Sequence, residues 1–237
     1  MKRYLTLLKI IMRNTLNLMV ALCLGFTGCV FAGGERAVKP AGEAEYTPLL
    51  DAVAHLQQVL APLNSFSARF KQSVYAPDGY PLQYSSGELK VMRPGKIYWA
   101  SEAPMEQLVI ADGETLWIYD PDLEQVTIRP FQKDIANTPA VLFIGALDNL
   151  ADYYQVTSET LQDTQQFTLI PVDRNSLYSK MGMGFSGTTP VSMDLWDSLG
   201  QRTAILFENP QLNPQIDQAL FDFVPPQGVD ILVNEER

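Results

Sequence analysis

Apolar residues between Leu49 and Leu63 recur at intervals of three and four, which places them on one face of a helix. Pro62 closes this predicted helix, because proline cannot continue the hydrogen-bond ladder. His55 lies off the apolar stripe, so we expect it at the surface or at the edge of a helix that covers the sheet as a lid. A second dense apolar run, Pro139 to Leu150, has proline near its start and predicts another short helix.

From Phe66 to the predicted last strand, Leu220 to Phe223, most segments alternate between apolar and polar residues, as strands do. Turn residues separate these segments at short spacing, which favours antiparallel meanders. The pattern predicts a mainly β chain of about ten strands with two or three short helices.

The strongest short hairpin signal is Asp112-Gly113, which stands between two strand-like segments. A two-residue turn here places four apolar side chains on one face of the hairpin: Leu108, Ile110, Trp117 and Tyr119. The other face carries Val109, Ala111, Leu116 and Ile118. Because both faces are apolar, we expect this hairpin to be covered on both sides.

Residues 1–32 predict a secretory signal peptide. Four basic residues precede a mostly apolar stretch, and Val30 and Ala32 put small residues at the positions that favour cleavage after Ala32. Two alternatives stay open: an uncleaved transmembrane anchor, and a lipoprotein signal in which Gly28-Cys29 directs lipidation of Cys29. A cysteine-free exported body is typical of the periplasm, where stray thiols are oxidised.

Residues 33–48 are polar and rich in Gly, Pro, Ala and Glu, which predicts a flexible linker before one folded domain at 49–237. Four of the 17 basic residues lie in the signal segment, so the rest carries 13 basic and 27 acidic residues and a net charge of −14. This charge argues against nucleic acid and anionic membrane as partners. Both cysteines also lie in the signal segment, so the domain has no disulfide, thiol nucleophile or thiolate metal site.

Motifs that carry chemistry are scarce, and we expect neither a cofactor nor a metal. Gly182–Gly187 spells G-x-G-x-x-G, but the following Thr188-Thr189-Pro190 leads into a strand rather than the helix that a dinucleotide site needs. Acidic pairs are plentiful, and no pair is distinguished from the others as a glycosidase pair. We therefore expect no enzyme, while a hydrolase that uses acidic residues or His55 is kept as an alternative.

The chain has more apolar side chains than a one-sided sheet requires. One account is an ordinary core between sheet and helices. The other is a concave sheet with helices as a lid, which leaves room for an apolar ligand. Composition does not separate these two accounts.

A series of short motifs bears on this choice. Phe66–Gln72, Arg93–Trp99, Asp112–Asp120, Asn137–Pro139 and the ending Phe221–Asp230 stand in an order that resembles the LolA family of periplasmic lipoprotein carriers. The resemblance implies an open, incomplete antiparallel β-barrel of about ten or eleven strands. It also implies two or three helices as a lid over an apolar cavity.

The resemblance further implies a chaperone that binds the acyl chains of lipoproteins, with no nucleic acid partner. The family takes acylated lipoproteins from an inner-membrane lipoprotein-releasing ABC transporter and delivers them to an outer-membrane lipoprotein receptor. We expect a monomer. The alternatives are the outer-membrane lipoprotein receptor of the same fold and a lipid-binding envelope sensor.

The family's arginine of the Arg-Pro motif matches Arg93, which implies that Arg93 holds the lid shut by hydrogen bonds to helix backbone. Ile97 stands where phenylalanine is common in the family, a departure at the mouth of the implied cavity. The expected cavity residues are Leu56, Val59, Leu60, Phe66, Phe70, Ile97, Trp99, Leu108, Ile110, Trp117, Tyr119, Leu142 and Phe143.

Overall fold

A computed structural model describes residues 49–131, 143 and 150–233, all within the compact unit Thr47–Arg237. The predicted signal peptide and linker lie outside the described residues. Within the described part of the chain, no helix combines the length and the hydropathy that crossing a membrane requires.

The described chain is mainly β. Its helices are α2 (Leu49–Leu60), α5 (Leu150–Tyr153) and the short 3-10 helices η2 (Pro121–Leu123) and η3 (Gln218–Phe221). The first six strands are β1 (Ser65–Tyr75), β2 (Pro81–Met92), β3 (Lys96–Ser101), β4 (Gln107–Asp112), β5 (Thr115–Asp120) and β6 (Gln125–Pro130). The other six are β7 (Tyr154–Leu161), β8 (Thr164–Pro171), β9 (Tyr178–Ser186), β10 (Thr189–Asp197), β11 (Arg202–Leu212) and β12 (Asp230–Val233).

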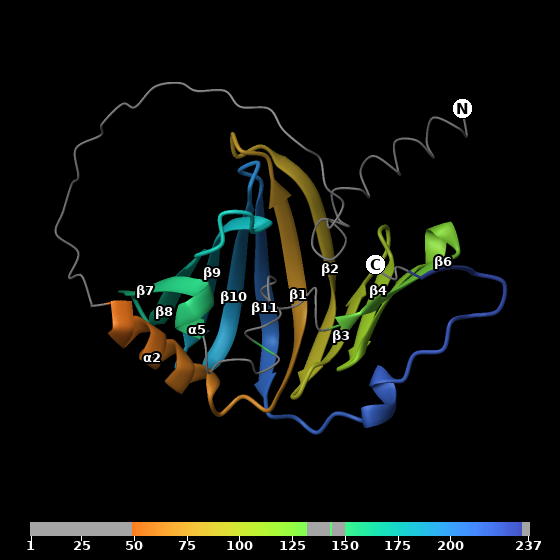
Figure 1. Ribbon diagram of the computed structural model, residues 1–237, viewed down its shortest axis with the longest axis horizontal. Helices are drawn as coiled ribbons and strands as arrows, with labels where there is room; N and C mark the ends of the chain where they lie inside the picture. Colours follow the sequence, from red (N-terminus) through yellow and green to blue (C-terminus); the bar gives the residue numbers. More distant parts are fainter. Residues whose placement is uncertain (1–48, 132–142, 144–149, 234–237) are drawn as a thin grey trace. The chain divides into compact units, whose positions relative to one another are not determined.

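All twelve strands form one sheet in the order β12-β6-β5-β4-β3-β2-β1-β11-β10-β9-β8-β7 (Figure 1). Neighbouring strands are antiparallel except β12, which pairs parallel to β6. The two edge strands, β12 and β7, do not pair with each other, so the sheet stays open. This confirms the predicted mainly β, open and incomplete barrel, with a slightly higher strand number than expected.

The C-terminal part differs from the sequence prediction. Leu220–Phe223 was expected to be a strand, but it overlaps the 3-10 helix η3, and the last strand is the later Asp230–Val233. Asp217 caps the start of η3, because its side chain accepts a hydrogen bond of 3.0 Å from the backbone N–H of Ala219. A polar cap of this kind favours a helical turn over continued strand.

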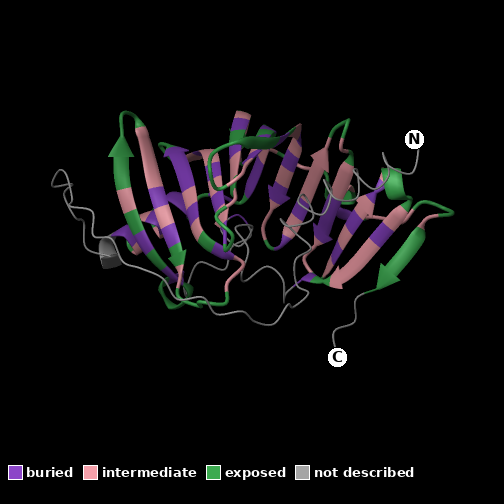
Figure 2. Ribbon diagram, turned by 90° about the horizontal axis from the view of Figure 1, so that it is seen from above, coloured by how far each residue is buried: buried purple, intermediate pink, exposed green. Residues whose placement is uncertain are grey.

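The sheet has two chemically distinct faces, shown by the alternation along β1. Phe66, Phe70 and Val74 are buried, whereas Arg69 and Lys71 between them are exposed. The buried side of β1 defines the inner face, and the side that carries Arg69 and Lys71 defines the outer face. Successive strand residues point to opposite faces, so the pairing register assigns every strand residue to one face or the other. The same striping of buried and exposed positions runs across the sheet in Figure 2.

Helix α2 covers part of the inner face. Leu56, Val59 and Leu60 of the predicted apolar stripe are buried, whereas Val53 is half-buried and Ala52 is buried beside it. His55 is half-buried at the edge of this contact, where its ring lies 5.3 Å from that of Phe167 on β8. Of the second predicted helix, Pro139–Leu150, only Phe143 and Leu150 are among the described residues, and both are buried.

The predicted β4–β5 hairpin is present, with its loop one residue later than expected, at Gly113-Glu114. The Asp112 carboxylate accepts hydrogen bonds of 2.8 Å from the backbone N–H groups of Glu114 and Thr115, which fixes the turn. This shift changes the register but not the division of side chains between faces, because the paired residues still alternate together.

Candidate functional site

An aromatic cluster marks the inner face where α2 and Phe143 cover it. The rings of Phe66, Phe143 and Phe207 lie 5.4 to 5.9 Å from one another, centre to centre. Next along β1, the Phe70 ring lies 4.1 Å from that of Trp99 on β3. These separations are those of packed aromatic pairs, so Phe143 contacts the sheet directly.

Arg93 follows β2, and its side chain links α2 and Phe143 to the sheet. Its Nη1 donates a hydrogen bond of 3.1 Å to the carbonyl oxygen of Leu60, the last residue of α2. Its Nε donates one of 3.1 Å to the carbonyl oxygen of Phe143. Carbonyl groups in the last turn of a helix have no partner within the helix. The arginine guanidinium holds several N–H donors in a fixed plane, so it can donate hydrogen bonds to such carbonyl groups.

The backbone around Arg93 holds the side chain in place. The Arg93 N–H donates a hydrogen bond of 2.8 Å to the carbonyl oxygen of Asn64, the residue before β1. Burial lowers the pKa of Arg93 from its ordinary value, because desolvation disfavours the cation. An arginine remains protonated in proteins even so, and its donors stay available across the physiological range.

The structure brings most of the predicted cavity residues to the inner side. By register, Phe66 and Phe70 share the inner face with Ile97 and Trp99. The buried side of α2 adds Leu56, Val59 and Leu60, and Phe143 joins through its ring contacts. Leu142 lies outside the described residues.

Four predicted residues are not brought together with this set. Trp99 of the inner face pairs with Val109, and Val109 pairs with Ile118, so these three residues share the inner face. The alternate hairpin residues therefore lie on the outer face: Leu108, Ile110, Trp117 and Tyr119. There, the Phe223 ring lies 6.3 Å from Trp117 and 6.0 Å from Tyr119. The prediction that this hairpin is covered on both sides is confirmed, but its outer cover is the C-terminal segment.

Sequence reasoning missed several aromatic and apolar residues of the inner face. Phe207 contacts both Phe66 and Phe143, and Phe167 contacts Phe185 at a ring separation of 5.7 Å. The alternation of Ile205 and Phe207 in β11 was the available signal for Phe207. Nothing in that local pattern says which partner strand lies beside it.

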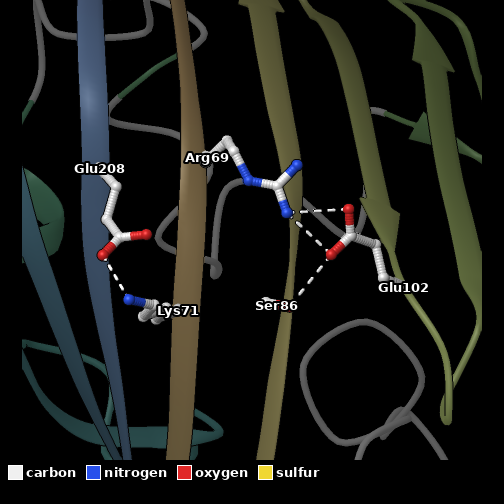
Figure 3. Close-up of polar contacts among 5 residues, drawn as sticks. All are labelled: Arg69, Lys71, Ser86, Glu102 and Glu208. Atoms are coloured by element: carbon white, nitrogen blue, oxygen red, sulfur yellow. Dashed lines mark hydrogen bonds and ion pairs between the residues drawn. The ribbon is translucent and has the colours of Figure 1, made fainter.

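The outer face carries ion pairs along β1 (Figure 3). Arg69 Nη2 donates to both carboxylate oxygens of Glu102 at 2.8 Å, and Ser86 donates to the same carboxylate at 3.1 Å. Lys71 Nζ lies 2.6 Å from a carboxylate oxygen of Glu208. These side chains are largely exposed, so the pairs stabilise the fold only weakly.

The glycine motif Gly182–Gly187 lies in β9 and the turn that follows, and β10 comes next. The context that a dinucleotide site requires is therefore missing there. Among the described residues, no group of three or more His, Cys, Asp or Glu side chains is placed to hold a metal ion.

Comparison with known proteins points to one family. The family model described as outer membrane lipoprotein carrier protein LolA matches residues 61–224. An outer-membrane lipoprotein carrier protein from Chromohalobacter salexigens is 38% identical over 177 residues, which cover 75% of this chain and 84% of that protein. One from Azotobacter vinelandii is 37% identical over 180 residues, which cover 76% of this chain and 87% of that protein.

Among solved structures, the chain is similar to a LolA superfamily protein from Nitrosomonas europaea. That likeness has a TM-score of 0.43 and 14% identity, and it covers 75% of this chain and 98% of the other. The family match and the curated relatives extend over most of the described domain. The chain therefore belongs to the LolA family of outer membrane lipoprotein carrier proteins.

Proposed function

We propose that this protein is a periplasmic chaperone that carries lipoproteins by enclosing their acyl chains between the inner face of its sheet and α2. It receives acylated lipoproteins from an inner-membrane lipoprotein-releasing ABC transporter and delivers them to an outer-membrane receptor. The observation that carries the proposal is the link made by Arg93, which joins the Leu60 and Phe143 carbonyl groups above one aromatic cluster.

The energetics of carrying require a binding site that can both hold and release. Each buried CH₂ contributes about 0.8 kcal/mol, so one chain of about 16 carbons contributes on the order of 12 kcal/mol. A cover with a closed and an open state supplies this control, because closure competes with the lipid for the same apolar surface. The strength of the Arg93 link then sets the apparent affinity.

The proposed acyl site uses side chains that already share the inner side. They are Leu56, Val59 and Leu60 of α2, Phe66, Phe70, Ile97 and Trp99 of the sheet, and Phe143. The four outer-face residues of the β4–β5 hairpin are not part of it, since Phe223 packs on that face. No cofactor, metal or catalytic residue is needed for this function.

A release assay tests the proposal. The purified domain is added to spheroplasts that hold newly acylated lipoproteins, and the supernatant is examined for a soluble stoichiometric complex. A known carrier in a parallel sample shows that the transporter is active. If lipoproteins stay on the membrane while that control releases them, this protein is not the carrier.

The lipoprotein receptor of the same fold is the second candidate, and Gly28-Cys29 in the sequence is the feature that favours it. Mass spectrometry of the mature N-terminus separates the two. A chain that begins at Gly33 supports the carrier, whereas a lipidated Cys29 at the N-terminus supports the receptor.

A further inference from the structure

The inner face changes from apolar to polar along β1 and β2. Phe70 pairs with Gly87; two residues further along β1, Gln72 pairs with Ser85, and after two more, Val74 pairs with Gln83. Gln72 and Gln83 are 4% and 8% exposed, which is unusual for an amide side chain. Buried polar side chains therefore stand directly beside the aromatic pair formed by Phe70 and Trp99.

Two polar atoms in this region are buried without a hydrogen-bond partner in the described part of the chain. They are the amide nitrogen Nε2 of Gln83 and the hydroxyl Oγ of Ser85. Polar atoms in protein interiors are nearly always paired, because an unpaired one loses its hydrogen bonds to water without replacement. Two such atoms on neighbouring positions of one strand need an explanation.

Both atoms are hydrogen-bond donors. The amide nitrogen of glutamine carries two N–H groups and accepts nothing, and a serine hydroxyl carries one O–H. A ligand that presents acceptor oxygens to the inner face can satisfy both of them. It must also tolerate the apolar surface of Phe70 and Trp99 beside them.

We propose that Gln83 and Ser85 form a polar subsite that donates hydrogen bonds to the ester carbonyl oxygens at the glyceryl head of a bound lipoprotein anchor. Two strand residues span about 7 Å. Ser85 lies two residues beyond Gly87, the partner of Phe70, and Gln83 lies two residues beyond Ser85, so a chain that lies on Phe70 and Trp99 directs its glyceryl head toward both donors. An acyl ester is apolar along its chain and offers only acceptors at its head. This inference rests on the proposed acyl binding and adds the orientation of the chain in the site.

The termination of β3 is consistent with this placement. β3 ends at Ser101, which pairs with Gly87, so the part of β2 that carries Gln83 and Ser85 extends past it. Next to this pair, the Glu102 N–H donates a hydrogen bond of 2.9 Å to the Ser86 carbonyl oxygen. The subsite thus lies where the apolar inner face borders the end of a neighbouring strand.

The test compares two probes by isothermal titration calorimetry: dioctanoylglycerol, which has ester carbonyls, and di-O-octylglycerol, its ether analogue without them. The wild-type protein and the variant Gln83→Leu/Ser85→Ala are titrated with both. We expect the ester-to-ether affinity ratio to fall roughly tenfold in the variant, as for the loss of one or two neutral hydrogen bonds. Ether affinity should stay within about twofold, since the ether does not accept those bonds at the carbonyl positions.

Ser86→Ala is the matched control. Ser86 lies on the same strand but on the outer face, where it donates to Glu102, so its removal should leave the ratio unchanged. Ser85→Ala alone provides a conservative variant if Gln83→Leu folds poorly. An equal ester-to-ether ratio in wild type and variants overturns the inference while acyl binding stands. If the wild type binds neither probe, the proposed acyl binding itself fails.

Two further measurements constrain the assignment. A cysteinyl peptide with a diacylglyceryl group and a short-chain phosphatidylglycerol carry the same ester chemistry from different sources. Higher affinity for the peptide supports a lipoprotein anchor as the ligand, and higher affinity for the phospholipid overturns that assignment.

Thermal unfolding of the Gln83→Leu/Ser85→Ala variant without ligand adds a check. Removal of unpaired donors should not lower the Tm, and a marked fall overturns the claim that these donors lack partners.

Discussion

Gly87 occupies a point on the inner face where a side chain does not fit. A Cβ built there would meet the carbonyl oxygen of Ala100 and would lie 2.7 Å from Cζ of Phe70. We predict that Gly87→Ala lowers the free energy of unfolding by about 1–3 kcal/mol, the usual cost of overpacking.

Chemical denaturation measures this change, and Gly182→Ala serves as the control. Gly182 is also a strand glycine, and a Cβ there makes only ordinary contacts, the nearest at 3.5 Å from Asp194 Cβ. The control should be neutral or slightly stabilising, because alanine restricts the unfolded chain more than glycine does. Equal effects of the two substitutions would contradict the close contact at Gly87.

Glu102 illustrates charge at the outer face. Hydrogen bonds from Arg69 and Ser86 lower the pKa of its carboxyl group below the ordinary value of 4.5. A carboxyl with a depressed folded-state pKa stabilises the protein above its unfolded pKa and loses that contribution as the pH falls through the folded value.

We therefore predict that Arg69→Gln raises the pKa of Glu102 toward its ordinary value. Carboxyl chemical shifts followed by NMR during an acid titration measure this directly. Lys71→Gln is the control, since Lys71 pairs with Glu208 instead. A Glu102 pKa that stays depressed in Arg69→Gln would show that the Ser86 hydroxyl or the local backbone sets it.

At the scale of elements, α2 depends on contacts at both its side and its end. Its buried side supplies apolar contacts, and its last carbonyl group accepts a hydrogen bond from Arg93. We predict that Arg93→Leu increases hydrogen exchange in α2 roughly tenfold or more, because the hydrogen bonds from a charged donor to the Leu60 and Phe143 carbonyl groups are lost.

Hydrogen–deuterium exchange of α2 peptides, read by mass spectrometry, measures this opening. Arg69→Leu removes an arginine from the outer face and should leave α2 exchange unchanged. The rate of lipoprotein release should change more than the global unfolding free energy in Arg93→Leu. Unchanged exchange in α2 would refute the latch, whatever happens to transport.

The β4–β5 hairpin shows what a local pattern can and cannot predict. Alternation correctly grouped Leu108 with Trp117 and Val109 with Ile118. The four hairpin residues expected in the cavity nevertheless lie on the outer face. The pattern of a hairpin with two apolar faces does not show which of its faces lies toward α2. The pairing of Trp99 with Val109 decides that question, together with Phe223 packing on the opposite side.

For the whole molecule, function requires that the inner and outer faces be chemically separate. Trp99 and Tyr98 are neighbours on β3 that point to opposite faces, and both are half-buried. We predict that Trp99→Glu abolishes acyl binding, since a carboxylate beside Phe70 places a charge in the proposed apolar site. Tyr98→Glu is the matched control and should retain binding.

Displacement of a fluorescent fatty-acid probe measures acyl binding in both variants, and circular dichroism shows that they fold. Retained binding in Trp99→Glu would place the acyl site elsewhere on the protein. Loss of binding in both variants would mean that the two faces are not functionally distinct.

The sequence alone determined the features that depend on neighbours along the chain. The apolar stripe of α2 follows from the helical period, and the two-faced strands follow from the period of two in an extended backbone. The Arg-Pro motif indicated Arg93 through the resemblance to the family, but it did not give the lengths of the hydrogen bonds that Arg93 makes. These signals were sufficient to predict a mainly β, open sheet with a helical cover.

Only the tertiary structure decided which faces meet and what covers them. Arg93 joins Leu60 and Phe143, which lie 33 and 50 residues away, and β12 pairs parallel to β6 from the far end of the domain. A local pattern states which side chains share a face, but the choice of partner depends on long-range pairing and on the apolar surface that remains to be buried. The unpaired donors of Gln83 and Ser85 became visible for the same reason, since a missing partner is a property of the folded surroundings.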